Sequence, residues 1–289
     1  MQPAGNPKPR PEGLSAFVSI RNRTGVSFLA KGARLAQHPG SQISSMDTNT
    51  EFPTLITDIA EKDEMSIGDA KEYLRIGRAG FDVVSEALRL TGRKTCNSIL
   101  DLPCGHGRVM RYFRAAFPEA RITACDLNKA GVDYCAKTFG ATPVYSKHRI
   151  QDVAMSEKFD LIWCGSLLTH LKEPLWMPFL SFFAEHLSEG GLLVFTTHGR
   201  LSTKWIREKI HTYALKEKDL PRLLTAYRRK GFGYAPYPNS PEYGITLSSP
   251  SWVLEQIQKF PNLRVVLLSE KGWSNHQDVY ACVYGNESF

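Results

Sequence analysis

The chain has 289 residues, of which 42% are hydrophobic and 22% charged, so it can bury a sizeable core in one large α/β domain or in two smaller ones. It contains no run of about 18 apolar residues and starts without the apolar core of a secretory signal, so the sequence predicts neither a transmembrane helix nor secretion. Its formal net charge of +7 favours anionic partners, whether nucleic acid, phosphorylated sugars or an acidic membrane face.

Residues 1–50 are predicted to form a basic, flexible tail. Prolines and glycines interrupt this segment, and Lys and Arg outnumber the acidic residues, so it can bury little apolar surface. A targeting peptide is the alternative, because the start is basic and carries arginine. The six cysteines are scattered without a CxxC pair, which suits reduced thiols in a cytoplasmic enzyme better than disulfides or a zinc site.

From residue 66 onward, segments with helix and strand patterns alternate. Ser66–Leu90 has a helical pattern that we expect to break near Gly77 and Gly80. Strands and helices then follow one another, which predicts a parallel sheet with helices on both faces. The expected strands are Ser98–Leu102, Arg121–Cys125, Pro143–Tyr145, Phe159–Cys164 and Gly191–Thr196, and the expected helices are Arg108–Phe117, Lys129–Phe139 and Pro174–Leu187.

The regular pattern pauses after the fifth strand. We expect two helices within Lys204–Lys230, the second opened by Pro221, then a loop with the sequence GFGYAPYPNSPEYG and a short helix at Trp252–Lys259. The strands Leu263–Leu268 and Val279–Val283 are joined by a loop too short for a helical crossover, so they should be antiparallel.

The sequence DLPCGHGR, residues 101–108, lies between an expected strand and an expected helix. This order exposes helix N-terminal amides to a ligand, and Gly105 and Gly107 let the backbone approach where a Cβ would collide. Asp126 ends the next strand about 20 residues on, where an acidic residue accepts hydrogen bonds from ribose hydroxyls. Met110 replaces the third glycine of the dinucleotide fingerprint, which counts against NAD or FAD but not against a ligand without phosphate.

Four stretches together resemble the class I S-adenosylmethionine-dependent methyltransferases. They are ILDLPCGHG, CDLN, FDLIWCGSLLTHL and LSEGGLLVFTTHG, in the order of that family's motifs. The resemblance covers Tyr73–Tyr284, and EYGITLSSPSWV and GWSNHQDVY further resemble a bacterial branch that is often associated with glycan-modifying proteins. It implies an α/β fold, with a doubly wound, mostly parallel seven-stranded sheet, an antiparallel last strand and a helical insert after strand five. It also implies S-adenosyl-L-methionine as the cofactor, S-adenosyl-L-homocysteine as its product, and no metal.

The resemblance also implies which residues bind the cofactor. Asp101 should anchor the region of the methionine ammonium, directly or through water. Asp126 should hold the ribose diol, and Leu127 should touch the adenine. Tyr73 and Arg78 are expected to close over the methionine carboxylate, with an ordinary helix surface as the alternative. The full expected set is Tyr73, Arg78, Asp101, Pro103, Gly105, Gly107, Asp126, Leu127, Ser146 near the adenine, and Gly165 and Ser166 beside the sulfonium.

The acceptor is expected at the carboxyl edge of the sheet, where loops after the strands bring polar side chains together. Histidine suits proton removal at neutral pH, and His276 is our first choice as the base, ahead of His170 and His198. Candidate acceptor-binding residues are Arg200, Tyr243, Trp273 and Asp278, the last of which could orient the His276 ring.

The predicted domain covers residues 51–289, with residues 201–250 as an insert that forms a substrate lid. The basic charge of the insert is typical of a solvated helical face, and a site for a phosphate-bearing acceptor is the more specific interpretation. Transfer of a methyl group to a hydroxyl of a small molecule or glycan is the favoured function. An RNA or DNA methyltransferase and a non-catalytic module that binds S-adenosylmethionine stay open, although strand four ends in WCGSLL, without the Asn/Asp-Pro-Pro-aromatic motif that holds a base amine.

Overall fold

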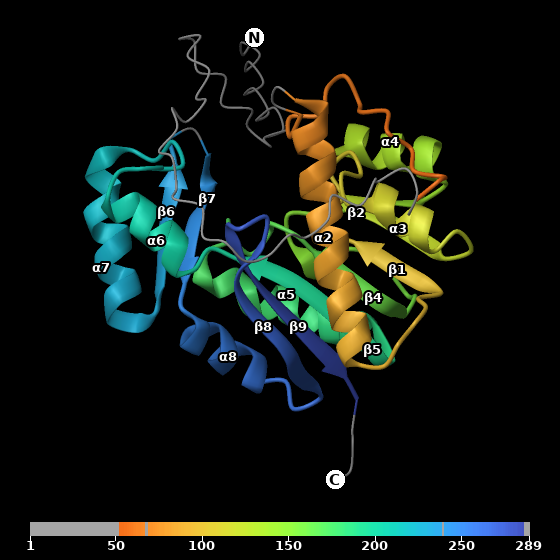
Figure 1. Cartoon of the computed structure of the whole chain (residues 1–289). Helices are drawn as coiled ribbons and strands as arrows, with labels where there is room; N and C mark the ends of the chain where they lie inside the picture. Colours follow the sequence, from red (N-terminus) through yellow and green to blue (C-terminus); the bar gives the residue numbers. More distant parts are fainter. Residues whose placement is uncertain (1–51, 67–68, 239, 286–289) are drawn as a thin grey trace, which may run out of the picture.

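The computed structural model describes residues 52–66, 69–238 and 240–285, so the predicted tail over residues 1–50 lies outside the described part of the chain (Figure 1). Seven strands form one sheet in the order β3-β2-β1-β4-β5-β9-β8. Strands β1 to β5 are parallel, β9 is antiparallel to β5, and β8 is antiparallel to β9. The predicted sheet with an antiparallel last strand is therefore confirmed. Its strands are β1 Ser98–Asp101, β2 Arg121–Asp126, β3 Thr142–Tyr145, β4 Phe159–Cys164, β5 Leu187–Thr197, β8 Leu263–Trp273 and β9 Gln277–Tyr284.

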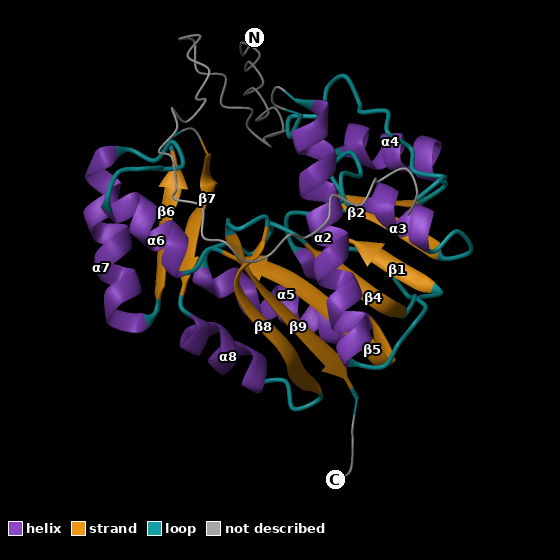
Figure 2. Ribbon diagram, in the orientation of Figure 1, coloured by secondary structure: helices purple, strands orange, loops and turns teal. Residues whose placement is uncertain are grey.

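Helices cover both faces of this sheet (Figure 2). Successive side chains of a strand point to opposite faces, so neighbouring residues such as Ile99 and Leu100 enter different apolar layers. Ile99 belongs to the layer formed with α2 (Ala70–Leu90), α3 (Met110–Ala116) and α4 (Lys129–Phe139). Leu100 belongs to the opposite layer, which contains side chains of α5 (Glu173–His186) and α8 (Pro250–Gln258). None of the described helices is long and apolar enough to cross a membrane.

Helix α2 is continuous, contrary to the predicted break near Gly77 and Gly80. A Cβ on Gly77 would lie 2.2 Å from the backbone oxygen of Arg108, and one on Gly80 would lie 3.0 Å from a methyl group of Val109. The two glycines therefore let α2 approach the segment that leads into α3. Close packing between elements, rather than a kink, explains why they stand in this helix.

The insert contains a β-hairpin where the sequence predicted a loop. Strand β6 (Phe232–Tyr237) pairs with β7 (Ser240–Ser248) in a separate two-stranded sheet, and the register shifts between Pro236 and Tyr237. This irregularity accommodates a proline, which has no N–H to donate to the ladder. The hairpin packs with α6 (Arg200–Arg207) and α7 (Leu220–Lys230) around a small core of Ile206, Leu215, Leu220, Leu223, Ala235, Ile245 and Leu247.

Candidate active site

A cavity opens at the carboxyl edge of the parallel strands, between the loops after β1, β2 and β4. It is also reached by residues 63–65, by Tyr243 of the insert hairpin and by Trp273 at the end of β8. The lining residues are Asp63, Glu64, Met65, Asp101, Pro103, Cys104, Gly105, His106, Arg108, Val109, Asp126, Asn128, Trp163, Gly165, Ser166, His170, Tyr243 and Trp273. Ligands bind at this edge in open α/β sheets, so this cavity is the candidate site.

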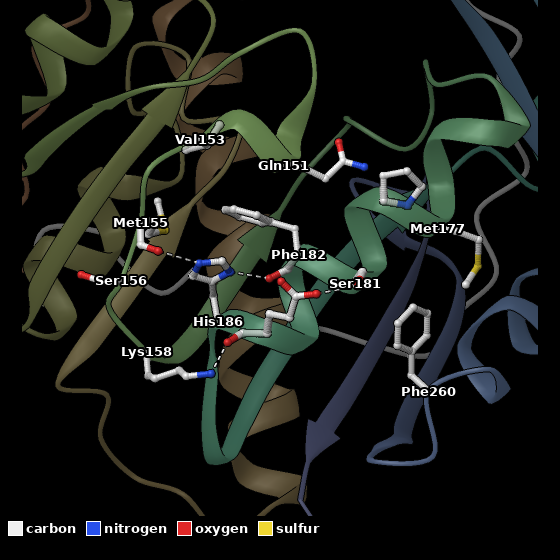
Figure 3. A pocket seen from close by; sticks show the side chains of 12 residues that line it. Gln151, Val153, Met155, Ser156, Lys158, Met177, Ser181, Phe182, His186 and Phe260 are labelled. Carbon is white, nitrogen blue, oxygen red and sulfur yellow. Dashed lines mark hydrogen bonds between the residues drawn. The ribbon is translucent and has the colours of Figure 1, made fainter.

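A second, larger hollow lies beside α5, as Figure 3 shows. It is lined by residues around Gln151–Lys158, by the outer face of α5 and by Phe260. Its one histidine, His186, has both ring nitrogens next to backbone oxygens, those of Phe182 and Met155. None of the predicted site residues lines this hollow, so its size does not make it the candidate site.

The glycine turn after β1 forms the floor of the cavity. Gly105 and Gly107 have φ values of +51° and +78°, a region that side-chain-bearing residues rarely adopt. A Cβ on Gly105 would meet no protein atom within 4 Å, whereas one on Gly107 would lie 2.3 Å from the Phe139 ring. Gly105 therefore leaves open space on the ligand side, and Gly107 allows α4 to pack behind the turn.

Two buried carboxylates face the cavity. Asp126 is held by the backbone N–H groups of Gly105 and Asn128, which donate to its two oxygens over 2.8 and 2.9 Å. Asp101 is 2% exposed, and its Oδ1 atom has no hydrogen-bond partner in the described part of the chain. Burial raises the pKa of both groups, and the charge of Asp126 raises that of Asp101 further. A buried carboxyl without a partner favours a ligand that brings a positive charge or hydroxyl donors.

This arrangement fits S-adenosylmethionine. The unpartnered oxygen of Asp101 suits the ammonium group, and the Asp126 carboxylate, already fixed by backbone amides, keeps lone pairs for the ribose hydroxyls. The open space beside Gly105 leaves room for the ligand against the backbone. These residues would hold the cofactor, and they are the residues that the motif resemblance implied.

At the end of β4, a polar network fixes Ser166, which lines the cavity with a φ of +62°. Its backbone N–H donates to the hydroxyl of Thr196 over 2.8 Å, and its own hydroxyl accepts from the amide nitrogen of Gln277 over 2.9 Å. The Thr196 hydroxyl donates to the other side of the same Gln277 amide over 2.6 Å. Strands β4, β5 and β9 thus hold an unusual backbone conformation at the cavity wall.

His170 is the predicted histidine that lines the cavity. Its Nδ1 lies 2.8 Å from the backbone oxygen of Gly244, so this nitrogen carries the hydrogen and Nε2 keeps its lone pair. The ring stacks on Tyr243 with 4.6 Å between the centroids. Burial lowers the pKa of His170 to about 4, which keeps the imidazole neutral at physiological pH.

His198 lies next to His170, and His276 lies next to His198, but neither of them lines the cavity. The Nε2 atom of His276 is 2.7 Å from the hydroxyl of Tyr213, and its ring stacks on Trp205 with centroids 4.8 Å apart. Asp278 does not orient this ring as expected, because its Oδ1 accepts from the backbone N–H of Lys271 instead. His198 is 3% exposed, with its centroid 5.2 Å from that of His276.

The other predicted residues that do not line the cavity either contact neighbouring residues or are exposed. The hydroxyl of Tyr73 donates to Asp63, Arg78 pairs with Asp82 over 2.6 Å, and Arg200 pairs with Glu270 near the surface. Leu127 is 43% exposed, and the backbone N–H of Ser146 donates to the backbone oxygen of Asp126. The structure brings together Asp101, Pro103, Gly105, Asp126, Gly165, Ser166, His170, Tyr243 and Trp273.

Several residues line the cavity that were not among the predicted site residues. His106 and Arg108 lie within the quoted DLPCGHGR stretch, and Asn128 within CDLN, so their proximity to the glycines was the available signal. Asp63–Met65 precede the first regular helix, and no sequence pattern indicates that this segment folds back over the glycine turn. Asp63 accepts a hydrogen bond from the Tyr73 hydroxyl, and its other oxygen lies 3.7 Å from Nδ1 of His106 in the glycine turn.

Comparison with known families gives a match that covers the glycine turn and β4. Residues 99–191 match the family described as "Methyltransferase domain". Curated relatives include the malonyl-[acyl-carrier protein] O-methyltransferases of Acetivibrio thermocellus, 22% identical over 45% of this chain and 45% of the relative, and of Paenibacillus sp., 32% identical over 37% and 41%. The chain thus matches less than half the length of these curated relatives.

Solved structures share the fold at low sequence identity. An S-adenosylmethionine-dependent methyltransferase from Clostridium acetobutylicum superposes with a TM-score of 0.50 and 13% identity, covering 72% of this chain and 92% of that one. The PH0226 protein from Pyrococcus horikoshii gives a TM-score of 0.53 at 12% identity, covering 82% and 97%. These similarities support the architecture of the sheet and its helices.

Proposed function

We propose that the chain transfers a methyl group from S-adenosylmethionine to a hydroxyl oxygen of a small-molecule or glycan acceptor, because residues 99–191 match a methyltransferase-domain family and the sheet has the architecture of a solved S-adenosylmethionine-dependent methyltransferase. The observation that carries the proposal is a single cavity that joins the buried carboxyls of Asp101 and Asp126 to the neutral ring of His170. Cofactor-binding groups and a base on one cavity are what methyl transfer to a hydroxyl requires.

The chain itself contributes alignment, exclusion of water and removal of a proton. S-adenosylmethionine, when bound, supplies a methyl carbon activated by positively charged sulfur. Asp101 would bind the ammonium and Asp126 the ribose, so that the two carboxyls would align the cofactor with the acceptor. The Nε2 atom of His170 would accept the proton of the acceptor hydroxyl during transfer of the methyl group. The hydrogen bond from Nδ1 to Gly244 holds the ring for this step.

Two features support an oxygen acceptor smaller than a nucleic acid. The curated relatives are named as O-methyltransferases, and strand β4 leads into GSLLTH rather than into the motif that holds a base amine. We further propose that the insert acts as a lid, because its hairpin places Tyr243 on the cavity and against His170. A phosphate-bearing acceptor would match the exposed basic residues at the end of α7, including Arg228 and Arg229.

Isothermal titration with S-adenosylhomocysteine tests the cofactor half of the proposal. Asp126→Ala should weaken binding by about 1.5–3 kcal/mol, the scale of hydrogen bonds to a charged group, and NAD should not bind measurably. Asp133→Ala, which changes an exposed carboxyl on α4, is the matched control and should leave binding unchanged. Tight NAD binding, or equal affinities for both variants, would reject the cavity as a cofactor site.

The acceptor half is tested with radiolabelled S-adenosylmethionine and a panel of hydroxylated small molecules, glycans, a malonylated acyl-carrier protein and RNA. Label in an ether-linked methyl group of a small molecule or glycan is the expected result. Label only in RNA, or in none of the panel despite tight cofactor binding, would favour the nucleic-acid or the non-catalytic alternative.

A further inference from the structure

Acidic side chains outnumber basic ones among the described residues that line the cavity. Asp63, Glu64, Asp101 and Asp126 contribute four carboxyl groups, and Arg108 is the one lysine or arginine among the described lining residues. S-adenosylmethionine carries two positive groups, its ammonium and its sulfonium, and one carboxylate. An acidic wall with a single cation is therefore the charge pattern that an amino-acid head group needs.

Two aromatic rings flank Arg108, and the nearby carboxyls of Asp63 and Glu72 favour its charge without a hydrogen bond to it. Its guanidinium carbon lies 5.8 Å from the Tyr73 ring centroid and 5.6 Å from that of Trp273. Both rings are fixed by their own polar atoms, since the Tyr73 hydroxyl donates to Asp63 over 2.5 Å and the Trp273 Nε1–H donates to the oxygen of Ile76 over 3.0 Å. In the described part of the chain, the guanidinium forms neither an ion pair nor a hydrogen bond.

Other nearby donors are already engaged. Arg78 pairs with Asp82 and lies over the Phe52 ring, and it does not line the cavity. Arg111 is 1% exposed, and its Nη1 donates to the backbone oxygens of Ile56 and Asp58. Its Nε and Nη2 have no hydrogen-bond partner in the described part of the chain, but Arg111 does not line the cavity. The polar hydrogens of Tyr73 and Trp273 are used as described, so among the described lining residues Arg108 is the cation whose N–H donors can reach a ligand in the cavity.

We propose that Arg108 binds the carboxylate of the methionine part of the cofactor while Asp101 faces its ammonium group, an assignment that rests on the proposed function. A guanidinium presents paired N–H donors that match the two oxygens of a carboxylate. Burial lowers the pKa of Arg108, which means that the pocket disfavours its charge, and a bound carboxylate would offset this cost. The role predicted for Arg78 is thereby assigned to a residue inside the glycine-turn motif.

Titration calorimetry with two ligands isolates this contact. S-adenosylhomocysteine carries the carboxylate, and its decarboxylated analogue keeps the ammonium, sulfur and nucleoside. The wild-type chain should bind S-adenosylhomocysteine more tightly than the analogue by about 10- to 100-fold, the range of one charged hydrogen-bonded pair. Arg108→Gln should lose this preference by weakening S-adenosylhomocysteine alone, with the affinity for the analogue within about twofold of the wild type.

Three further variants complete the design. Arg108→Lys keeps the charge without the paired donors and should show an intermediate preference, which provides a readout if Arg108→Gln does not fold. Arg78→Gln tests the competing arginine, and Arg89→Gln, which breaks an exposed pair with Glu86, serves as a surface control. Both should keep the wild-type preference.

The outcomes separate the two proposals. If Arg108→Gln weakens both ligands equally, or if Arg78→Gln abolishes the preference, the assignment of Arg108 is overturned while the cofactor site stands. If the wild-type chain binds neither ligand, the proposed function itself fails.

Discussion

His170 and His276 differ in what their ring nitrogens already bind. His170 uses Nδ1 for the Gly244 oxygen and lines the cavity, whereas the Nε2 atom of His276 is engaged by the Tyr213 hydroxyl. We therefore expect His170→Ala to lower kcat by about 10²–10⁴ and His276→Ala to lower it by less than about tenfold. Because the pKa of His170 is lowered to about 4, the wild-type kcat should hold through neutral pH and fall only as the pH approaches that value.

Steady-state kinetics of the two variants, with cofactor affinity measured alongside, checks this expectation. His170→Ala should keep its affinity for S-adenosylhomocysteine within a few-fold. A larger loss of kcat in His276→Ala would restore the first choice made from the sequence. Near-normal kcat in both variants would mean that alignment alone carries the transfer.

A site residue could be predicted where a short stretch of sequence determines its position, and could not where its position depends on the packing of distant segments. Asp101, Gly105 and Asp126 line the cavity because strand, turn and strand end are fixed by a short motif. Tyr243 and Asp63 come from distant segments, and their places depend on an unrecognised hairpin and on a segment with no periodicity. Arg78 was selected for its nearness to the motif in sequence, but the direction of its side chain depends on how α2 crosses the sheet.

At the scale of elements, the crossing of α2 over the glycine turn depends on Gly77. In an exposed helix, Gly→Ala stabilises by about 1 kcal/mol, but here the new Cβ would lie 2.2 Å from the backbone oxygen of Arg108. Gly77→Ala should instead destabilise by about 1–3 kcal/mol, because overpacking forces the two segments apart. Urea unfolding measures the change, and cofactor affinity should fall with it since Arg108 moves.

Gly80→Ala serves as a milder substitution in the same helix, with which the effect of Gly77→Ala on stability is compared. Its Cβ would lie 3.0 Å from a Val109 methyl group, and side-chain atoms can shift more easily than a backbone oxygen. The loss should therefore be smaller than for Gly77→Ala. Stabilisation by both variants would show that the close approach of α2 does not constrain the site.

Helices and strands could be predicted where the spacing of apolar residues in the sequence matches the side chains that the fold buries. Helix α4 was predicted with the observed bounds, and the parallel strands within a few residues, because each strand is flanked by a helix of clear period. The hairpin β6–β7 was predicted as a loop because its prolines, glycines and tyrosines are typical of loops. It is stabilised by contacts with α6 and α7, which local sequence does not reveal.

Helix α7 ends in Arg228, Arg229 and Lys230. Lys230 pairs with Glu173, whereas Arg228 and Arg229 are exposed and form no ion pair within the described residues. If an anionic acceptor is recruited here, replacing Arg228 and Arg229 with Gln should raise the acceptor KM several-fold and leave cofactor affinity unchanged. The effect should shrink as salt rises, because exposed charges are screened. Equal KM values at low salt would instead assign these residues to the favourable interaction of cations with a helix C-terminus.

At the scale of the whole molecule, the sheet and the insert meet at a group of histidines. His170 and His198 lie at the carboxyl edge of the sheet, and His211 and His276 complete the group with Tyr213 between them. Burial is the first cause of the lowered pKa of all four. Folding therefore brings neutral imidazoles together between the two parts of the chain, which links the stability of the interface to pH.

The sign of this linkage follows from proton binding. An unfolded histidine titrates near pH 6.5, so between about pH 6.5 and 4 the unfolded chain binds protons that the folded chain does not. The histidine contribution to the free energy of unfolding is thus complete above pH 6.5 and is lost as the pH falls towards 4. Asp101, Asp126 and Asp278, whose pKa values are raised, act in the opposite direction within part of this window.

A difference between two variants isolates the histidine contribution from these carboxyls. His276→Phe keeps a ring to stack on Trp205 but cannot be protonated, and the pKa of His276 is lowered to about 4. Between pH 6.5 and 4, the wild type should lose about 2 kcal/mol of unfolding free energy more than His276→Phe does, since one pKa unit corresponds to about 1.4 kcal/mol and the ring is partly exposed. Urea unfolding at half-unit pH steps gives the two curves. Parallel curves would mean that His276 is as easily protonated in the folded chain as in the unfolded one, and that its contact with Tyr213 does not depend on the neutral ring.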